Sequence, residues 1–199
     1  MRISRREFIG GGLATAWAID AAARPGTPAT LIVGTNLEPT TLTSAITTAG
    51  PTSLISTKIF EGLISYDLQN RMVPQLAKSW DVSRDGLTFT FHLRPGVTWH
   101  GGKPFTSADV AFSLLEVWKK YHGRGRTTFA NVISAETPSP LVVVFRLSKP
   151  APYLLSALTA VESAVLPRHL YEGTDILANP HNNAPIGTGP FRFSKWLRG

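Results

Sequence analysis

The sequence of 199 residues predicts a mixed α/β or α+β domain, and three observations support this prediction. Residues Leu87 to Leu93 alternate large apolar side chains with polar ones, which is the period of a half-buried strand. Thr106 to Asp109 reads as a capping box, and an apolar stripe at helical spacing follows it. Strand-like and helix-like stretches then follow one another in an irregular order. This order fits neither a regular alternation of strands and helices nor an all-β protein.

The first elements are expected before this central strand. Residues 30–34 form a short apolar run of strand type, and the loop that follows extends from Asn36 to Thr43. Apolar residues between positions 54 and 63 recur at helical spacing, so a helix is expected from about Thr52 to Phe60.

The central strand is expected to belong to a hairpin. Ser83 to Gly86 has the composition of a turn and joins residues 79–82 to the strand. Pro95-Gly96 forms a second turn, which leads to a short strand-like stretch at 97–99. The helix that begins at the capping box is expected to end near Tyr121.

The second half of the chain continues the mixed pattern. In chain order we expect strands at 132–137 and 141–147, a short helix from about Tyr153, a strand near 164–166, a polar loop at 178–185 and the start of a strand at 191–196.

The N-terminal residues resemble an export signal. Arg5-Arg6 is followed by Phe8, a weakly apolar stretch comes next, and Ala21 to Ala23 offers small residues for cleavage. The arginine pair is typical of twin-arginine signals, which direct folded proteins to the twin-arginine export machinery. We therefore expect residues 1–23 to be removed and the mature product to be soluble and periplasmic. An ordinary basic N-terminus is the alternative.

The positive charge raises the question of a nucleic-acid partner. The formal net charge is +7, and the only dense cluster of basic residues spans 119–126. Lysines followed by glycine are also typical of the end of a helix, where they favour the negative end of its dipole. We prefer this second interpretation and expect no nucleic-acid partner, because an exported protein rarely meets its own genome.

No pattern of catalytic or metal-binding residues is evident. The chain has no cysteine, which excludes disulfides, a cysteine nucleophile and a thiolate metal site. The five histidines show no metal-ligand spacing, and no serine lies in a G-x-S-x-G elbow. Gly187-Thr188-Gly189 begins like a dinucleotide motif, but Arg192 occupies the position of its third glycine. We therefore expect no catalytic residue, no metal and no cofactor, although folding can still assemble a carboxylate pair.

Five blocks of the chain occur in the order found in one protein family: 60–63, 73–80, 85–100, 102–110 and 187–191. With them the chain resembles the N-terminal lobe of the oligopeptide- and dipeptide-binding class (peptide/nickel class, family 5) of ABC-importer extracellular solute-binding proteins. The resemblance covers nearly all of the mature chain.

The resemblance implies one lobe of a two-lobed, hinge-closing fold of the type II periplasmic-binding-protein class. Residues 24–199 would form this N-terminal lobe, with a β-rich subdomain inserted at 73–165. Members of the family are longer, and their second lobe would follow Gly199. The implied ligand is a peptide or a similar small solute, with nickel complexes, opines and sugars as alternatives. The implied partners are the permease subunits of an ABC transporter, and the implied protein is not an enzyme.

The candidate binding residues lie in two loops. Ligands gather at strand ends in open α/β sheets, which selects the loop after the first strand with Thr35, Asn36, Leu37 and Glu38. Gly187, Thr188 and Gly189 would offer backbone amides to the same ligand. Two plain turns are the alternative. For the whole chain, the alternatives are a non-functional or structural fragment of such a protein and a secreted enzyme.

Overall fold

The computed structural model describes residues 32–35 and 37–198. The expected signal at residues 1–23 therefore lies outside the described residues. The chain divides into two compact units, residues 1–34 and residues 35–199, and the helices and strands of the described residues lie in the second unit.

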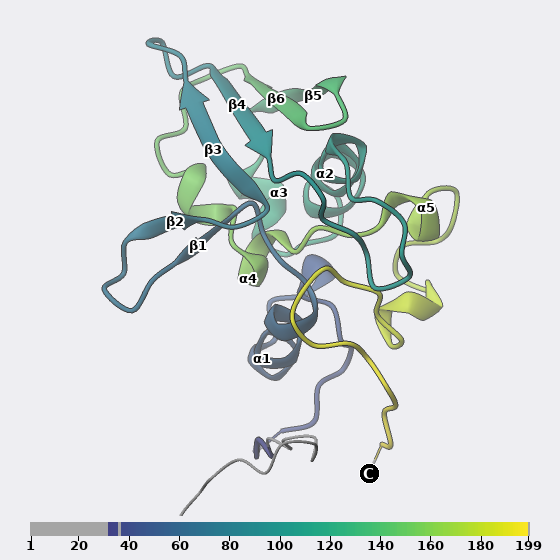
Figure 1. The fold of residues 1–199 in the computed structure, drawn as a ribbon. Helices are drawn as coiled ribbons and strands as arrows, with labels where there is room; N and C mark the ends of the chain where they lie inside the picture. The colour runs from purple at the N-terminus through teal and green to yellow at the C-terminus, as the bar shows by residue number, and fades with distance from the viewer. Residues whose placement is uncertain (1–31, 36, 199) are drawn as a thin grey trace, which may run out of the picture. The chain divides into compact units, whose positions relative to one another are not determined.

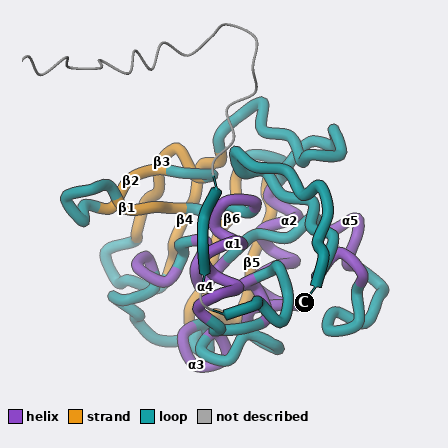
Figure 2. Tube along the Cα trace, turned by 90° about the horizontal axis from the view of Figure 1, so that it is seen from below, coloured by secondary structure: helices purple, strands orange, loops and turns teal. Residues whose placement is uncertain are grey.

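The second unit is built around an antiparallel sheet of four strands in the order β3-β4-β6-β5 (Figure 1). These strands are β3 (Ala77–Val82), β4 (Thr88–Leu93), β5 (Val132–Ser139) and β6 (Val142–Leu147). A separate hairpin pairs β1 (Ile64–Tyr66) with β2 (Met72–Pro74). Figure 2 shows β1, β2 and β3 together at one side of the unit, with α5 at the opposite side.

The central strand confirms the sequence pattern. Phe89, Phe91 and Leu93 of β4 are buried, whereas the residues between them are partly exposed. The Phe91 ring lies 5.0 Å from the ring of Phe145 on β6, measured between centroids. Gly86 closes the predicted hairpin with a φ of +69°, a backbone conformation that glycine adopts without steric cost.

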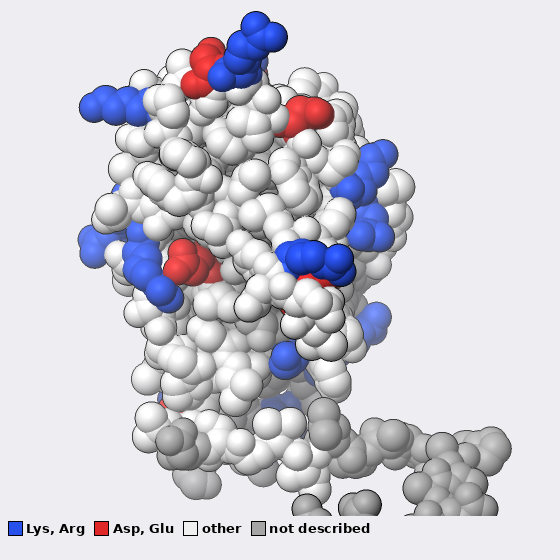
Figure 3. Space-filling view, turned by 90° about the vertical axis from the view of Figure 1, so that its left-hand side faces the viewer, with Lys and Arg blue, Asp and Glu red and all other residues white. Residues whose placement is uncertain are grey.

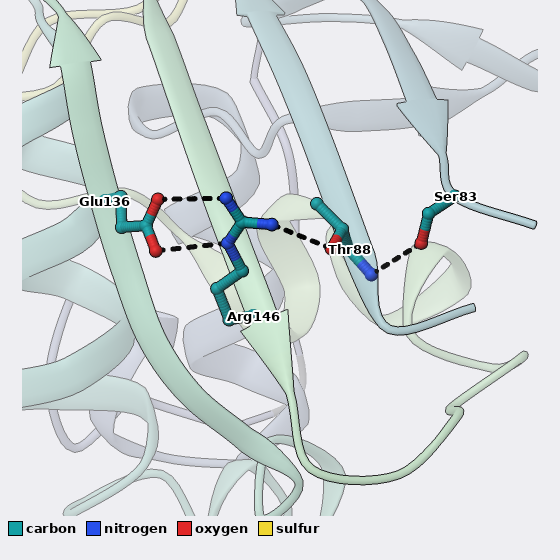
Figure 4. Close-up of polar contacts among 4 residues, drawn as sticks. All are labelled: Ser83, Thr88, Glu136 and Arg146. Atoms are coloured by element: carbon teal, nitrogen blue, oxygen red, sulfur yellow. Dashed lines mark hydrogen bonds and ion pairs between the residues drawn. The ribbon is translucent and has the colours of Figure 1, made fainter. Parts of the chain in front are cut away.

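The opposite face of this sheet carries a row of polar side chains. Arg146 on β6 donates two hydrogen bonds to the Glu136 carboxylate on β5, at 3.1 and 3.3 Å (Figure 4). Its Nη1 also donates to the Thr88 hydroxyl at 3.0 Å, and the Thr88 amide donates to the Ser83 hydroxyl at 2.9 Å. A row of side chains therefore connects three strands across the exposed face.

Two of the predicted helices are confirmed. Helix α1 spans Gly50–Ile59, close to the expected range. Helix α2 (Ser107–Phe112) begins at the predicted capping box and contacts β5 and β6. It continues without a break into a π-helical segment, η2 (Ser113–Trp118), where the Lys119 amide donates to the Leu114 carbonyl at 3.1 Å. The sequence did not predict this change of helix type.

Short helices complete the unit between longer loops. They are η1 (Ser44–Ile46), α3 (Gly125–Thr128), η3 (Leu155–Ala157), α4 (Ala160–Ser163), α5 (Arg168–Tyr171) and η4 (Pro180–Asn182). The predicted polar loop at 178–185 contains η4, and the short helix expected from Tyr153 is the 3-10 turn η3. The strands expected at 132–137 and 141–147 are β5 and β6.

The strand expected near Ala164 to Leu166 is wrong. These residues are buried, but side chains and a loop bind their backbone instead of a neighbouring strand. The Leu166 amide donates to the Ser113 hydroxyl at 2.9 Å, and the Val165 amide donates to the Glu61 carbonyl at 3.1 Å. The apolar run therefore predicted correctly that these residues are buried, but it predicted incorrectly that they pair as a strand.

The strands expected at 30–34 and 191–196 are not observed either. Residues 32–34 have no regular structure, whereas positions 30 and 31 of that predicted strand lie outside the described residues. Residues 191–196 run without strand pairing, and Phe191 is 52% exposed. A strand needs a neighbour to pair its backbone, and among the described residues no strand pairs with either segment.

Candidate functional site

The turn Gly187-Thr188-Gly189 is held by one histidine from a distant loop. His100 Nδ1 accepts from the Gly187 amide at 3.3 Å, and His100 Nε2 lies 2.8 Å from the Gly189 carbonyl oxygen. The His100 amide also donates to the Gly187 carbonyl at 2.8 Å. A carbonyl can only accept, so Nε2 carries the proton and the ring is in the neutral Nε2–H tautomer. The turn is therefore fixed on both sides by His100.

The same turn is pressed against the C-terminal end of α1. The Gly189 amide donates to the Ile59 carbonyl at 2.8 Å. A Cβ atom at Gly187 would lie 1.8 Å from the Ile59 carbonyl oxygen, and one at Gly189 would lie 2.6 Å from the Lys58 carbonyl oxygen. The glycines are thus required for this close approach. Their two amides are already paired within the protein, and the Thr188 hydroxyl is buried without a hydrogen-bond partner among the described residues.

The loop at 35–38 is exposed and contacts the C-terminal segment. Leu37 is 62% exposed, and the Thr35 hydroxyl donates to the Leu37 carbonyl at 3.2 Å. Glu38 Oε1 accepts from the Trp196 indole at 3.2 Å. The Arg198 guanidinium lies 4.1 Å from the centre of the Trp196 ring. Asn36 lies outside the described residues. Among the others, no hydrogen bond or ion pair joins this loop to the turn at 187–189.

Most of the basic side chains in the cluster at 119–126 form hydrogen bonds or ion pairs with other residues of the protein. Lys119 Nζ donates to the Val132 carbonyl, Lys120 pairs with Glu116 at 2.5 Å, and Arg124 pairs with Glu162 at 3.1 Å. Figure 3 shows that Lys and Arg side chains are scattered over the face it presents, with acidic side chains among them. The cluster therefore acts mainly as the end of a helix and the turn that follows it.

Two hollows occur on the described surface. The larger has a volume of about 410 Å³ and is lined by Arg124, Thr128, Tyr153, Ser156, Ala157, Thr159, Val161 and Glu162. The smaller has about 330 Å³ and is lined by Lys103, Pro104, Thr106, Ala108, Asp109, Arg168, His169 and Glu172. Neither set of lining residues was predicted from the sequence, because the residues of each set come from separate segments of the chain. Tyr153, which follows Pro150 and Pro152, was the one available signal in the sequence.

The pKa shifts of two histidines, His122 and His169, are caused mainly by burial. Burial lowers the pKa of His122, and nearby Arg124 lowers it further, while Glu162 opposes the shift. The pKa of His169 is also lowered, chiefly by burial and by Lys103. Within the described part of the chain, no group of three or more histidines and carboxylates is placed to hold a metal ion. None of the helices described here has the length and apolar character that a bilayer crossing requires.

Comparison with known proteins identifies the family. Residues 71–199 match the model of bacterial extracellular solute-binding proteins, family 5, middle part. The chain belongs to this family. Among its relatives, a Brucella ovis protein named as an ABC transporter peptide-binding protein is 39% identical over 157 residues. That match covers 75% of this chain and 29% of the relative. The oligopeptide-binding protein AppA of Bacillus subtilis is 30% identical over 185 residues, 90% of this chain and 34% of AppA.

Solved structures of solute-binding proteins share the fold. NikZ from Campylobacter jejuni, in complex with Ni(L-His), matches with a TM-score of 0.71 and 32% identity, over 81% of this chain and 32% of NikZ. AgaA from A. tumefaciens R10, in complex with agropinic acid, matches with a TM-score of 0.70 and 34% identity, over the same shares. The predicted fold class is thus confirmed: the unit is a mixed α/β part of the type II periplasmic-binding fold. The chain spans about a third of the length of the relatives it matches.

Proposed function

We propose that this chain is the N-terminal lobe of the periplasmic substrate-binding component of an ABC importer. It captures a peptide or a similar small solute and delivers it to the permease subunits in the membrane, without catalysing a reaction. The observation that carries the proposal is the match of its fold to family members solved with bound solutes: Ni(L-His), agropinic acid and a nonapeptide.

The lobe comprises residues 24–199, and its β-rich subdomain at 73–165 gives it rigidity. The packed sheet face supports this proposal, since each large apolar side chain buried there contributes about 1.5–3 kcal/mol. A rigid lobe is what loops need in order to meet a ligand in fixed positions.

The ligand contacts in this proposal come from the two predicted loops. Thr35, Leu37 and Glu38, which are exposed, contribute contacts from one loop, and Asn36, which lies outside the described residues, is proposed with them. In the turn at 187–189, the Gly187 and Gly189 amides are paired within the protein and the Thr188 hydroxyl is buried, so the turn contributes through the partly exposed remainder of Thr188. The clamp by His100 supports this role, because a binding turn must keep its shape.

Residues 1–23 act in this proposal as a twin-arginine signal that delivers the folded protein to the periplasm. The arginine pair Arg5-Arg6, the weakly apolar stretch after it and the small residues Ala21 to Ala23 support this assignment.

A thermal-shift experiment tests the binding proposal. The purified chain is heated with dipeptides to nonapeptides, Ni(L-His) or agropinic acid, and AppA with its nonapeptide serves as the positive control. A solute present at about ten times its Kd should stabilise the chain by about 1.4 kcal/mol. This corresponds to a rise of about 3–6 °C in Tm for a protein of this size. No shift with any solute, in the presence of a shift for AppA, would contradict the proposal.

A further inference from the structure

The larger hollow joins three segments that carry complementary chemistry. Arg124 precedes α3, Tyr153 precedes η3, Ser156 lies within η3, and Glu162 belongs to α4. Its volume of about 410 Å³ falls in the range of small-molecule sites. It shares no lining residue with the loop at 35–38 or with the turn at 187–189.

The backbone next to Arg124 is held in place by contacts with His122 and Trp118. The Gly125 amide donates to His122 Nδ1 at 2.9 Å, and His122 is fully buried. A Cβ atom at Gly125 would lie 2.5 Å from the Trp118 carbonyl oxygen, so the chain approaches Trp118 as closely as only glycine permits. The sequence His122-Gly123-Arg124-Gly125 therefore forms a rigid turn that presents the Arg124 side chain outward.

The guanidinium of Arg124 is only partly used by the protein. Arg124 Nη1 lies 3.1 Å from Glu162 Oε1, and no other ion pair or hydrogen bond of this guanidinium occurs among the described residues. The Arg124 side chain is 57% exposed, whereas that of Glu162 is 22% exposed. Glu162 thus serves as an anchor for one edge of the guanidinium. The remaining donors face the hollow or solvent and can bind a carboxylate in the forked geometry that arginine prefers.

Apolar surface lies beside these donors. Tyr153 is 49% exposed and Val161 is 41% exposed, and both line the same hollow. A solute that satisfies the whole hollow must therefore carry a carboxylate for Arg124 and an apolar group for Tyr153 and Val161.

We infer that this hollow binds small solutes that combine a free carboxylate with an apolar side chain, with Arg124 as the residue that recognises the carboxylate. The inference goes beyond the proposed function, because it assigns a second site apart from the loop at 35–38 and the turn at 187–189. Glu162 is a positioning residue that keeps the guanidinium at the wall of the hollow.

An NMR titration tests this inference. The ¹⁵N-labelled chain is titrated with alanyl-phenylalanine and, separately, with its C-terminal amide, to about 10 mM, since a Kd of 1 mM corresponds to only −4.1 kcal/mol. We expect the free acid to shift the amide signals of Arg124, Thr128, Tyr153 and Glu162. The amide derivative should bind about tenfold more weakly or worse, because it lacks the charged partner of Arg124.

Variants separate recognition from folding. Arg124→Gln should weaken binding of the free acid about tenfold or more, and Arg124→Lys should restore part of it. Arg146→Gln is the matched control, because Arg146 also pairs with a glutamate but lies on the polar sheet face, and it should leave binding unchanged. The dispersion of the NMR spectrum shows that each variant is folded.

Three results would overturn the inference: equal binding of acid and amide, unchanged binding in Arg124→Gln, or no shift at the residues of the hollow. Shifts confined to residues 35–38 and 188 would also overturn it, yet would support the proposed function. Failure of every solute in the thermal-shift panel would instead count against the proposed function itself.

Discussion

Asp109 accepts a hydrogen bond from the backbone amide of Arg168, with Oδ1 and the nitrogen 2.9 Å apart. Its other oxygen, Oδ2, accepts from the Thr106 amide at 2.8 Å and from the Thr106 hydroxyl at 3.3 Å. The residue is only 5% exposed. One buried carboxylate therefore ties the start of α2 to the start of α5, a helix that the sequence pattern did not predict.

Replacing Asp109 should destabilise the lobe. Asp109→Ala leaves two backbone amides without their charged acceptor, and each such bond contributes about 1.5–3 kcal/mol. We expect a loss of at least about 1.5–3 kcal/mol in the free energy of unfolding, measured by urea denaturation. Glu116→Ala, at an exposed pair with Lys120, is the control and should stay within about 0.5 kcal/mol.

The partner residue in the capping box has a smaller expected effect. Thr106→Ala should cost about 0.5–2 kcal/mol through the weakened cap. An unchanged urea midpoint would mean that the Thr106 side chain stabilises nothing and that Asp109 alone holds this helix start.

Alanine at the glycines of the turn should displace it from α1. In Gly187→Ala and Gly189→Ala, the new Cβ overlaps carbonyl oxygens of Lys58 and Ile59, and backbone must move to relieve the contact. Overpacking of this kind costs about 1–3 kcal/mol, occasionally more. Gly50→Ala is the control, because no atom lies within 4 Å of its Cβ position. Equal stability of all three variants would show that the turn is not packed on α1.

Stability should fall on mild acidification because of His122. Burial lowers its folded-state pKa, so the unfolded chain takes up a proton at a higher pH than the folded chain. The stability that neutral His122 provides is complete above the ordinary histidine pKa of about 6.5 and is lost as pH falls below it. His122→Asn keeps an acceptor for the Gly125 amide but cannot titrate. It should flatten the dependence of unfolding free energy on pH in this range.

His169 contributes in the same direction, since its pKa is also lowered. The offset between the parent chain and His122→Asn above pH 7 measures lost packing, whereas the difference in slope below about pH 6.5 measures titration. Parallel curves over the whole range would assign the acid sensitivity to other groups.

The export signal can be tested independently of the fold. Replacing Arg5 and Arg6 together with lysine should stop export through the twin-arginine route, because that route depends on the arginine pair. Fractionation of cells that express the chain measures the periplasmic share. Arg24→Lys, beyond the predicted cleavage point, is the control. Unchanged export of the double variant through this route would refute the assignment.

Local patterns predicted the elements whose structure depends on neighbours in the sequence. The alternation at Leu87 to Leu93, the turn at Gly86 and the capping box before α2 are confirmed, since each is set by residues within one or two turns of chain. The strands expected at 164–166 and 191–196 are wrong, because pairing depends on partners that a local window does not contain.

For the candidate site, too, local sequence patterns could not predict the tertiary contacts. The glycines at 187 and 189 indicated a tight turn, but the sequence could not reveal that His100 clamps it, nor that α1 lies beneath it. Likewise, the cluster at 119–126 was recognised as a helix end, whereas the pairing of Arg124 with Glu162 depends on tertiary packing. The roles of Thr35 to Glu38 in binding remain predictions.

The hydrogen bonds between the C-terminal end of α1 and the segment that contains the turn also determine when, during synthesis, this part of the protein can form. The last carbonyl groups of a helix have no partner in the helix itself, and here those of Lys58 and Ile59 accept from Phe191 and Gly189. Synthesis proceeds from the N-terminus, so these donors leave the ribosome long after α1 does. Every shorter nascent chain therefore carries α1 with this end open to water. Helix α1 is the first α-helix of the unit to be made, and its C-terminal end is among the last parts of the unit to be closed.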